Sequence, residues 1–220
     1  ALSSAASDVY KRQVYRIPAV NLVGRGCLAQ LKDEIGTLGC KKALVVSDKF
    51  LTENGVVEKV TKVLDQVGIE HTLYNDVKQN PSVANVEGGL EVLKKENCDF
   101  IVSIGGGSPQ DCGKAISVLA TNGGKITDYE GVNKSQKKCL PIVAIATTAG
   151  TSAEVTINYV ITDEETHIKM IMVDRNTLAS ITVNDPELML SKPAGLTAAT
   201  GMDALTPVSY THLTLPTIRL

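Results

Sequence analysis

The sequence has no tryptophan, and aromatic residues make up only 4% of its 220 residues. It also has no apolar run long enough for a membrane span, and no signal peptide is evident. A formal net charge of −2 gives no electrostatic basis for binding nucleic acid or an anionic membrane surface. We therefore expect a cytoplasmic protein without a nucleic-acid or membrane partner.

The sequence also lacks a paired cysteine pattern. Its five cysteines are scattered, and none forms a C-x-x-C pair. This pattern is typical of reduced thiols in the cytosol rather than of a disulfide framework or a zinc knuckle. Hydrophobic residues, in contrast, make up 43% of the chain, which is enough for a substantial core.

The two ends of the sequence differ from the rest. Residues 1–13 are small and polar and then basic, and residues 207–220 place Pro207 in what should be a growing helix. Both strings resemble translated vector or adaptor sequence more than part of a folded protein. We expect non-native tails at 1–13 and 207–220, so that the chain is a fragment of a longer protein.

The most informative stretch is the run FIVSIGGGSPQD, which ends at Asp111. Its apolar part predicts a strand at 100–104 that is buried on both faces. A glycine turn (105–107) follows, and then Ser108 and Pro109 stand at the expected N-cap and first helical position, with Asp111 completing a capping box. A helix N-terminus behind a glycine turn suits a phosphate, although a well-capped turn without a ligand is the alternative.

Strand and helix patterns alternate along the chain, which predicts βαβ units and an α/β, Rossmann-like fold. We expect a mainly parallel sheet with helices on both faces. The expected strands lie at 42–46, 69–74, 100–104, 141–146 and 179–183, with a strand pair at 159–162 and 168–173 and an extended segment at 14–23. The expected helices lie at 27–38, 56–67, 82–93, 109–119 and 193–206.

Polar residues follow several of these strands, where ligands of such sheets bind. Asp48 closes one strand, and its carboxylate suits the hydroxyls of a ribose while repelling a 2′-phosphate, which favours NAD over NADP. The alternative is a helix-capping aspartate. The threonine loop (147–152, TTAGTS) offers hydroxyls to a pyrophosphate or a ribose, or is a polar turn.

Asp203 lies in a predicted helix of small apolar residues. A carboxylate in such surroundings is costly if it is buried without compensation, and a bound metal would compensate it. The helical position four residues later, which would share its face, holds Pro207. A carboxylate on a solvated face is the alternative.

Taken together, the runs VVSDK, NPS, IGGGSPQDCGKAI, TTAGTSAEVT, INYVITDEE and TAATGMDALT resemble the iron-containing (group III) alcohol dehydrogenases. Within that family the sequence is most similar to the lactaldehyde reductase and 1,2-propanediol oxidoreductase branch. The resemblance covers 14–206. It implies an NAD-binding α/β domain at 14–190 and, at 191–206, the start of an all-helical metal-binding domain that is mostly missing.

The resemblance also implies roles for individual residues. Asp203 corresponds to the first ligand of a divalent metal, Fe²⁺ or alternatively zinc, and the family has a histidine where this chain has Pro207. No catalytic acid or base is assigned. The positions that correspond to NAD-contacting residues are Asp48, Asn80, Gly106, Gly107, Ser108, Asp111, Thr147, Thr148, Thr151 and Lys169.

The activity implied for the intact protein is hydride transfer between NAD(H) and a small aldehyde, alcohol or diol, with the metal polarising the carbonyl. A homo-oligomer, a dimer, is implied as well. One alternative is a glycerol-dehydrogenase-like or dehydroquinate-synthase-like enzyme of the same architecture. The other is an inactive nucleotide-binding fragment, because this chain lacks the family's remaining metal ligands.

Overall fold

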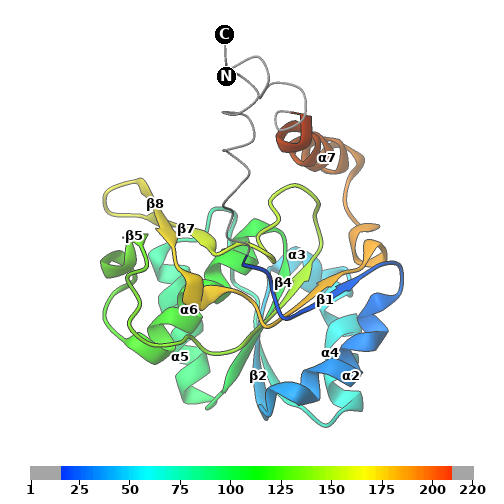
Figure 1. Ribbon diagram of the computed structural model, residues 1–220, viewed down its shortest axis with the longest axis horizontal. Helices are drawn as coiled ribbons and strands as arrows, with labels where there is room; N and C mark the ends of the chain where they lie inside the picture. The colour runs from blue at the N-terminus through cyan, green and yellow to red at the C-terminus, as the bar shows by residue number, and fades with distance from the viewer. Residues whose placement is uncertain (1–15, 210–220) are drawn as a thin grey trace, which may run out of the picture.

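The computed structural model describes residues 16–209, which form a parallel sheet between two layers of helices (Figure 1). The strands of this sheet are β1 (Val20–Val23), β2 (Lys42–Val46), β3 (Glu70–Tyr74), β4 (Phe100–Gly105), β6 (Ile142–Ala146) and β9 (Ile181–Asn184). Their order is β1-β9-β6-β4-β2-β3, and every pair in the sheet is parallel. The predicted Rossmann-like α/β fold is therefore confirmed.

The central strands are buried on both faces, as their apolar runs predict. All six residues of β4 are buried, and so are the last four of β2. Because neighbouring residues of a strand point to opposite faces, Leu44 and Ile101 enter one hydrophobic cluster while Val45 and Val102 enter the other. The sheet thus separates two cores, one under each helical layer.

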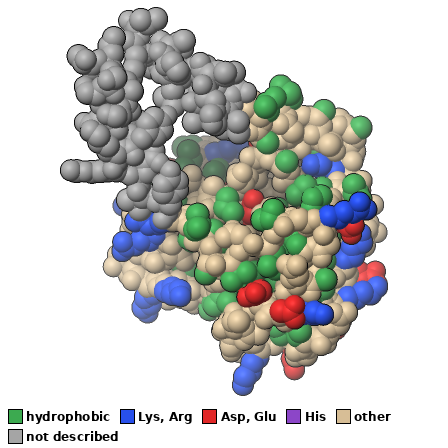
Figure 2. All heavy atoms as spheres, turned by 45° about the vertical axis from the view of Figure 1, so that its right-hand side comes forward, with side chains coloured by type: hydrophobic (Ala, Val, Ile, Leu, Met, Phe, Trp, Pro, Cys, Tyr) green, Lys and Arg blue, Asp and Glu red, His purple; other side chains and the backbone are tan. Residues whose placement is uncertain are grey.

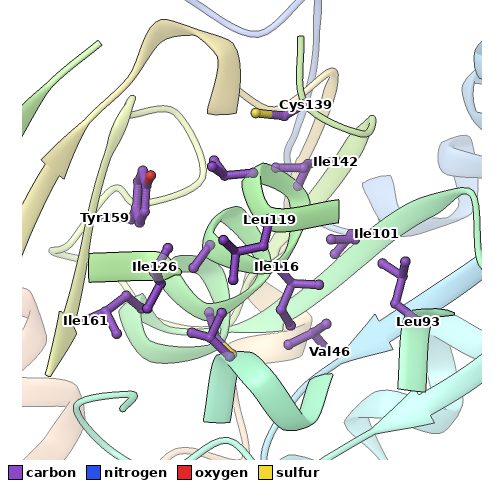
Figure 3. Packing of buried hydrophobic residues seen from close by; sticks show 14 of the residues in the cluster. Val46, Leu93, Ile101, Ile116, Leu119, Ile126, Cys139, Ile142, Tyr159 and Ile161 are labelled. Carbon is purple, nitrogen blue, oxygen red and sulfur yellow. The ribbon is translucent and has the colours of Figure 1, made fainter. Parts of the chain in front are cut away.

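Helices cover both faces of the sheet. The helices are α2 (Leu31–Ile35), α3 (Lys49–Glu53), α4 (Val56–Gln66), α5 (Val83–Lys95), α6 (Gly107–Asn122) and α7 (Ala194–Ser209). The side chains of α2, α3 and α4 enter one core, and those of α5 and α6 enter the other. Figure 3 shows the second core, where α6 packs between the strands and the segment of Tyr159 and Ile161.

Short 3₁₀ turns interrupt or follow several elements, at Cys27–Gln30, Gly36–Leu38, Ile126–Tyr129, Arg175–Thr177 and Pro186–Met189. The helix predicted at 27–38 is therefore a short α-helix between two 3₁₀ turns. Gly36 opens the second turn, and glycine in a helix interior weakens the α-helical conformation. The helix α3 was not predicted, because five residues are too few for a recognisable period.

A second sheet consists of β5 (Gly131–Val132), β8 (Ile168–Val173) and β7 (Asn158–Asp163) in that order. The strands β7 and β8 pair antiparallel across a turn at 164–167, which confirms the predicted strand pair. Two inward side chains of β7, Tyr159 and Ile161, belong to the core around α6. This small sheet therefore lies against the helix that follows the glycine turn.

The order of the strands reverses between β2 and β4. The chain passes from β2 outward to β3, and it then returns to place β4 on the opposite side of β2. In open α/β sheets a ligand binds in the crevice outside the carboxyl ends of the strands at such a reversal. The residues that follow β2 and β4 are therefore the place where this fold is expected to bind a ligand.

The first turn of α6 differs from the prediction. Gly106 is its N-cap, and the helix begins at Gly107, so the capping box predicted for Ser108 and Asp111 is wrong. Both side chains contact distant segments instead, as described below. Because Gly106 and Gly107 have no Cβ, the backbone can begin the helix two positions earlier than it would with Ser108 as the N-cap.

At the C-terminal end, α7 corresponds to the helix predicted at 193–206 and continues past Pro207 to Ser209. The predicted tail at 1–13 lies outside the described residues, and so do residues 210–220 of the tail predicted at 207–220. Within residues 16–209, no helix has the length and the hydrophobicity that crossing a membrane requires.

Candidate functional site

A groove lies outside the carboxyl ends of β2, β4 and β6, which are neighbours in the sheet. Gly106 directly follows β4 and Thr147 directly follows β6, and Asp48 lies two positions after the last residue of β2. The groove has two adjoining parts. One part is lined by Asp48, Phe50, Leu51, Gly106, Thr147, Thr148, Leu188, Ser191, Lys192 and Leu196. The other is lined by Asp48, Phe50, Val77, Lys78, Gln79, Gly106, Gly107, Ser108, Pro109 and Leu196.

The glycine turn brings backbone close to its neighbours. Gly105 has a φ of +154°, and a Cβ there would overlap the ring of Pro109. A Cβ on Gly106 would lie 2.9 Å from Thr148 Oγ1. The first amides of α6 have no partner within the helix and carry the positive end of its dipole. The groove thus has a floor of backbone N–H groups that suits an anion.

The threonine loop lies directly beside this glycine turn. Thr147 is buried, and its backbone N–H donates to the Gly105 carbonyl over 3.1 Å. Thr148 faces Gly106, and a Cβ on Gly107 would lie 3.4 Å from Thr151 Cγ2. The structure therefore brings all three predicted threonines against the glycine turn.

Buried polar contacts fix these strand ends in register. Gln110, which is 1% exposed, donates from Nε2 to the carbonyls of Ser103 and Ile145, over 3.3 and 3.0 Å. Its Oε1 accepts a hydrogen bond from Ser103 Oγ over 2.5 Å. Ser47 Oγ donates to the Ile104 carbonyl over 2.9 Å. Because such groups are costly to leave unpaired, they hold β2, β4, β6 and α6 in one arrangement.

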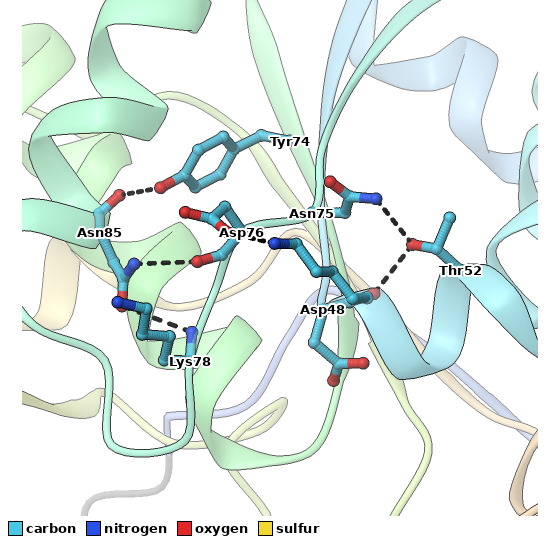
Figure 4. A network of polar contacts seen from close by, with 8 residues as sticks. Asp48, Thr52, Tyr74, Asn75, Asp76, Lys78 and Asn85 are labelled. Carbon is cyan, nitrogen blue, oxygen red and sulfur yellow. Dashed lines mark hydrogen bonds and ion pairs between the residues drawn. The ribbon is translucent and has the colours of Figure 1, made fainter.

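Asp48 caps a helix and also lines the groove. It is the N-cap of α3, where Oδ1 accepts the Leu51 N–H over 2.8 Å. Its side chain also lines both parts of the groove. In Figure 4 the Asp48 carboxylate points away from the neighbouring polar network, while its carbonyl accepts from Thr52 Oγ1 over 2.8 Å. Capping orients the carboxylate without removing it from the groove.

The loop that follows β3 is shaped by one buried amide (Figure 4). Asn85, which is 5% exposed, donates from Nδ2 to the Asp76 carbonyl over 2.9 Å. Its Oδ1 accepts the Lys78 N–H over 3.4 Å, and its carbonyl accepts the Tyr74 hydroxyl over 2.8 Å. These contacts turn the chain so that Lys78 and Gln79 reach the groove.

A chain of hydrogen bonds closes one side of the groove. The Asn80 N–H donates to Ser108 Oγ over 3.2 Å, and Lys169 Nζ donates to Asn80 Oδ1 over 2.8 Å. Asn80 has a φ of +54°, a conformation that asparagine tolerates better than most residues. Three predicted residues from three separate elements are thus connected.

Asp111 lies apart from the groove. Its Oδ2 accepts the Val160 N–H over 3.1 Å, which ties α6 to β7. Burial raises the pKa of the Asp111 carboxyl to about 6, and the charge of Lys114 partly opposes this rise. The structure therefore gives Asp111 a hydrogen-bond partner in β7, and its contact with the cofactor stays a prediction.

Asp203 lies on α7 and touches the threonine loop at Gly150. A Cβ on Gly150, whose φ is +107°, would lie 2.5 Å from Asp203 Oδ2 and 2.8 Å from the Thr200 carbonyl. The carboxylate is exposed. Among the described residues, no group of three or more His, Cys, Asp or Glu side chains is placed to hold a metal ion. Asp203 thus supplies one potential ligand, and the described residues do not complete a metal site.

The helix around Asp203 is apolar and exposed. Met202 and Leu205 are 61% and 53% exposed, and Leu196, which reaches the groove, is 48% exposed. Figure 2 shows the side of the molecule that carries α7, where hydrophobic side chains gather on the upper part of the surface.

Sequence patterns did not identify several of the groove residues, among them Phe50, Lys78, Gln79 and Leu196. Phe50 is 49% exposed. The sequence signal for Phe50 was an aromatic residue two positions after Asp48. Lys78 and Gln79 reach the groove through the contacts of Asn85, which lie beyond the range of a local pattern.

The family model for iron-containing alcohol dehydrogenases matches residues 18–186. Alcohol dehydrogenase 4 of Schizosaccharomyces pombe is 51% identical over 203 residues, which are 92% of this chain and 48% of that protein. Lactaldehyde reductase of Escherichia coli is 44% identical, over 87% of this chain and 50% of that protein. The chain spans about half the length of the curated relatives it matches.

Solved structures agree with this similarity. A 1,3-propanediol oxidoreductase superposes with a TM-score of 0.86 at 45% identity, covering 89% of this chain and 51% of that one. The sulfoacetaldehyde reductase of Bifidobacterium kashiwanohense, solved in complex with NAD⁺, superposes with a TM-score of 0.79 at 34% identity. That superposition covers 87% of this chain and 51% of the reductase.

Proposed function

The chain belongs to the iron-containing alcohol dehydrogenases, and from that premise we propose that it carries the NAD(H)-binding part of an enzyme for small aldehydes and alcohols. Lactaldehyde and 1,2-propanediol are the proposed substrate pair. The observation that carries the proposal is the groove at the reversal of strand order between β2 and β4. A single groove there combines a carboxylate, a glycine turn and a threonine loop.

The groove carries groups that suit the parts of a dinucleotide. The pyrophosphate would lie over the glycine turn, where the amides of Gly107 and Ser108 begin α6. A Cβ on Gly106 would lie within 2.9 Å of Thr148 Oγ1, so glycine keeps the backbone open there. The threonine hydroxyls and the polar chain from Ser108 to Lys169 would bind the remaining polar groups.

Asp48 would accept hydrogen bonds from the ribose hydroxyls, because its carboxylate lines the groove while Oδ1 caps α3. A 2′-phosphate would meet the same negative charge at close range, and this charge favours NAD(H) over NADP(H). When bound, the nicotinamide would supply the hydride, and this chain's residues would hold and orient it.

Asp203 as a ligand of iron or zinc stays a prediction, and no catalytic step is assigned to it, since the described residues contain no group of three or more His, Cys, Asp or Glu side chains that could hold a metal ion. This observation favours the second candidate function, a nucleotide-binding unit without turnover. The domain division at 190, the dimer and the cytoplasmic location are likewise predictions.

The proposal is tested by the ratio of NADH to NADPH affinity in wild type and Asp48→Ser. Serine is a good N-cap, so α3 keeps its cap while the charge is lost. We expect NADH to bind wild type at least about tenfold more tightly than NADPH, a difference of about 1.4 kcal/mol, and Asp48→Ser to reduce this preference.

The control is Asp33→Ser, an exposed change on α2 outside the groove, which should leave the ratio unchanged. Equal preference for NADH in wild type and Asp48→Ser would contradict the assigned role of Asp48. Failure of the folded wild-type chain to bind either nucleotide would contradict the proposed function.

A further inference from the structure

Lys114 is a buried charge that the groove does not use. It lies in α6 and is 1% exposed. Its Nζ donates to three backbone carbonyls, those of Ala153, Thr156 and Asn158, over 2.7, 2.8 and 2.8 Å. Burying an ammonium group is expensive unless its donors are satisfied, and here three N–H donors meet three carbonyl acceptors. The cost of burying this ammonium group indicates that Lys114 has a role beyond packing.

All three carbonyls belong to one segment, 153–158, which leads from the threonine loop into β7. Ala153 follows Thr151 by two positions, and Asn158 is the first residue of β7. One turn earlier on α6, Asp111 accepts the N–H of Val160 in the same strand. Two neighbouring charged side chains of α6 therefore hold the exit of the threonine loop and the start of β7.

The same helix begins at the glycine turn. Its N-terminal end lines the groove, and the threonine loop lines it beside that end. Lys114 itself does not line the groove, and its burial excludes contact with a molecule bound there. Its effect on a bound nucleotide must pass through the position of the loop.

We propose that Lys114 is a positioning residue, whose ammonium group fixes the exit of the threonine loop to α6 and thereby sets the position of this loop in the groove. This proposal rests on the proposed function, because the consequence it names is the affinity for a nicotinamide dinucleotide. The link is mechanical, because the start of α6 and the threonine loop both line the groove, and the three hydrogen bonds of Lys114 join α6 to the segment that follows the loop.

The charge state at neutral pH agrees with this role. Burial lowers the pKa of Lys114 to about 8, and the charges of Asp111 and Glu154 oppose the decrease. Lys114 is therefore mainly protonated at pH 7. A neutral amine has two N–H donors, so one of the three carbonyls would lose its partner.

The test uses Lys114→Ala and Lys114→Met in the full chain, with hydrogen exchange of amides 147–158 and NADH titration as readouts. Methionine fills the space without donors, so a folded variant remains available if alanine leaves too large a cavity. We expect faster exchange in 147–158, unchanged exchange in β2 and β4, and NADH affinity reduced by about tenfold, as expected when buried acceptors lose a charged donor.

Added propylammonium should bind the cavity of Lys114→Ala and restore both readouts, because it supplies the missing carbons and the missing donors. The neutral analogue 1-propanol should not restore them. Leu119→Ala, a buried apolar truncation on the same helix, is the control; it should lower stability without selective exchange in 147–158 and without rescue by propylammonium.

Unchanged loop exchange and NADH affinity in the folded Lys114 variants would overturn the proposal, and so would a loss that propylammonium fails to restore. If wild type binds no NADH, the proposed function fails, yet the exchange experiment still decides whether Lys114 holds the loop. The two failures are thus distinguishable.

Discussion

The groove and the surroundings of Asp203 differ in how the chain supports them. The groove is built by residues that follow three adjacent strands. Buried hydrogen bonds of Ser47, Gln110 and Lys114 connect these strands, α6 and the segment after the threonine loop. Asp203, in contrast, stands on a helix whose side chains from 194 to 206 are exposed or half-buried. Parallel strands bring their ends together by themselves, whereas a metal site needs ligands that separate elements deliver.

The largest difference should come from Gly105→Ala. A Cβ there would overlap Pro109 at the start of α6, and the residue has a φ of +154°. Strain and overpacking together should lower the free energy of unfolding by about 3–5 kcal/mol. Urea unfolding measures the loss. Gly24→Ala, which has a φ of +133° but open space around it, should cost much less, and equal losses would contradict the packing account.

A smaller effect is expected for Gln110→Leu, which removes the buried amide behind the groove. Ser103 Oγ and the Ile145 carbonyl then lose their partner, and the free energy of unfolding should fall by about 2–3 kcal/mol. Thermal or urea unfolding is the measurement. Gln66→Leu, an exposed change at the end of α4, should alter stability by no more than about 0.5 kcal/mol; similar effects of the two substitutions would show that these contacts contribute little.

The half-buried Asp111 should give a pH dependence. Because burial raises its pKa from 3.8 to about 6, the folded chain binds more protons than the unfolded chain between these values. This contribution to stability is therefore present below about pH 4 and lost as the pH rises through 6. Relative to Asp111→Asn, wild type should lose about 2 kcal/mol over this range.

Urea unfolding of both proteins at several pH values measures that difference. The exposed control Asp33→Asn should follow wild type at every pH. A wild type and an Asp111→Asn variant with the same slope would mean that the carboxyl is better solvated than its position indicates.

The smallest global effect is expected for Gly150→Ala, where α7 meets the threonine loop. A Cβ there would crowd Asp203 and the Thr200 carbonyl, but α7 has few other contacts and can move away. We expect the free energy of unfolding to fall by about 1 kcal/mol, with faster hydrogen exchange in α7 and unchanged exchange in β4. A loss as large as that of Gly105→Ala would show that the two regions are supported equally.

Local patterns were sufficient for the parts of the fold that repeat a period. The buried strands β2 and β4 were predicted to within one residue, since their apolar runs are bounded by polar residues and glycines. The position of Asp48 at a strand end was predicted for the same reason. These features depend on neighbours in the sequence.

Features that depend on distant partners were not predictable. Ser108 looked like an N-cap, but its hydroxyl accepts the Asn80 N–H, and Asp111 binds β7. Lys114 gave no local signal, because a lysine in a helix is ordinarily exposed and its three carbonyls lie about 40 residues later. Long-range contacts decided these roles.

The most direct test of the account is to follow backbone amide NMR signals of the chain while NADH is added. We expect saturable shifts at the glycine turn and the threonine loop, with little change at 202–206 around Asp203, whether or not Fe²⁺ is present. Shifts confined to α7, or a glycine turn that stays unperturbed at saturating NADH, would contradict the assignment of the groove as the nucleotide site.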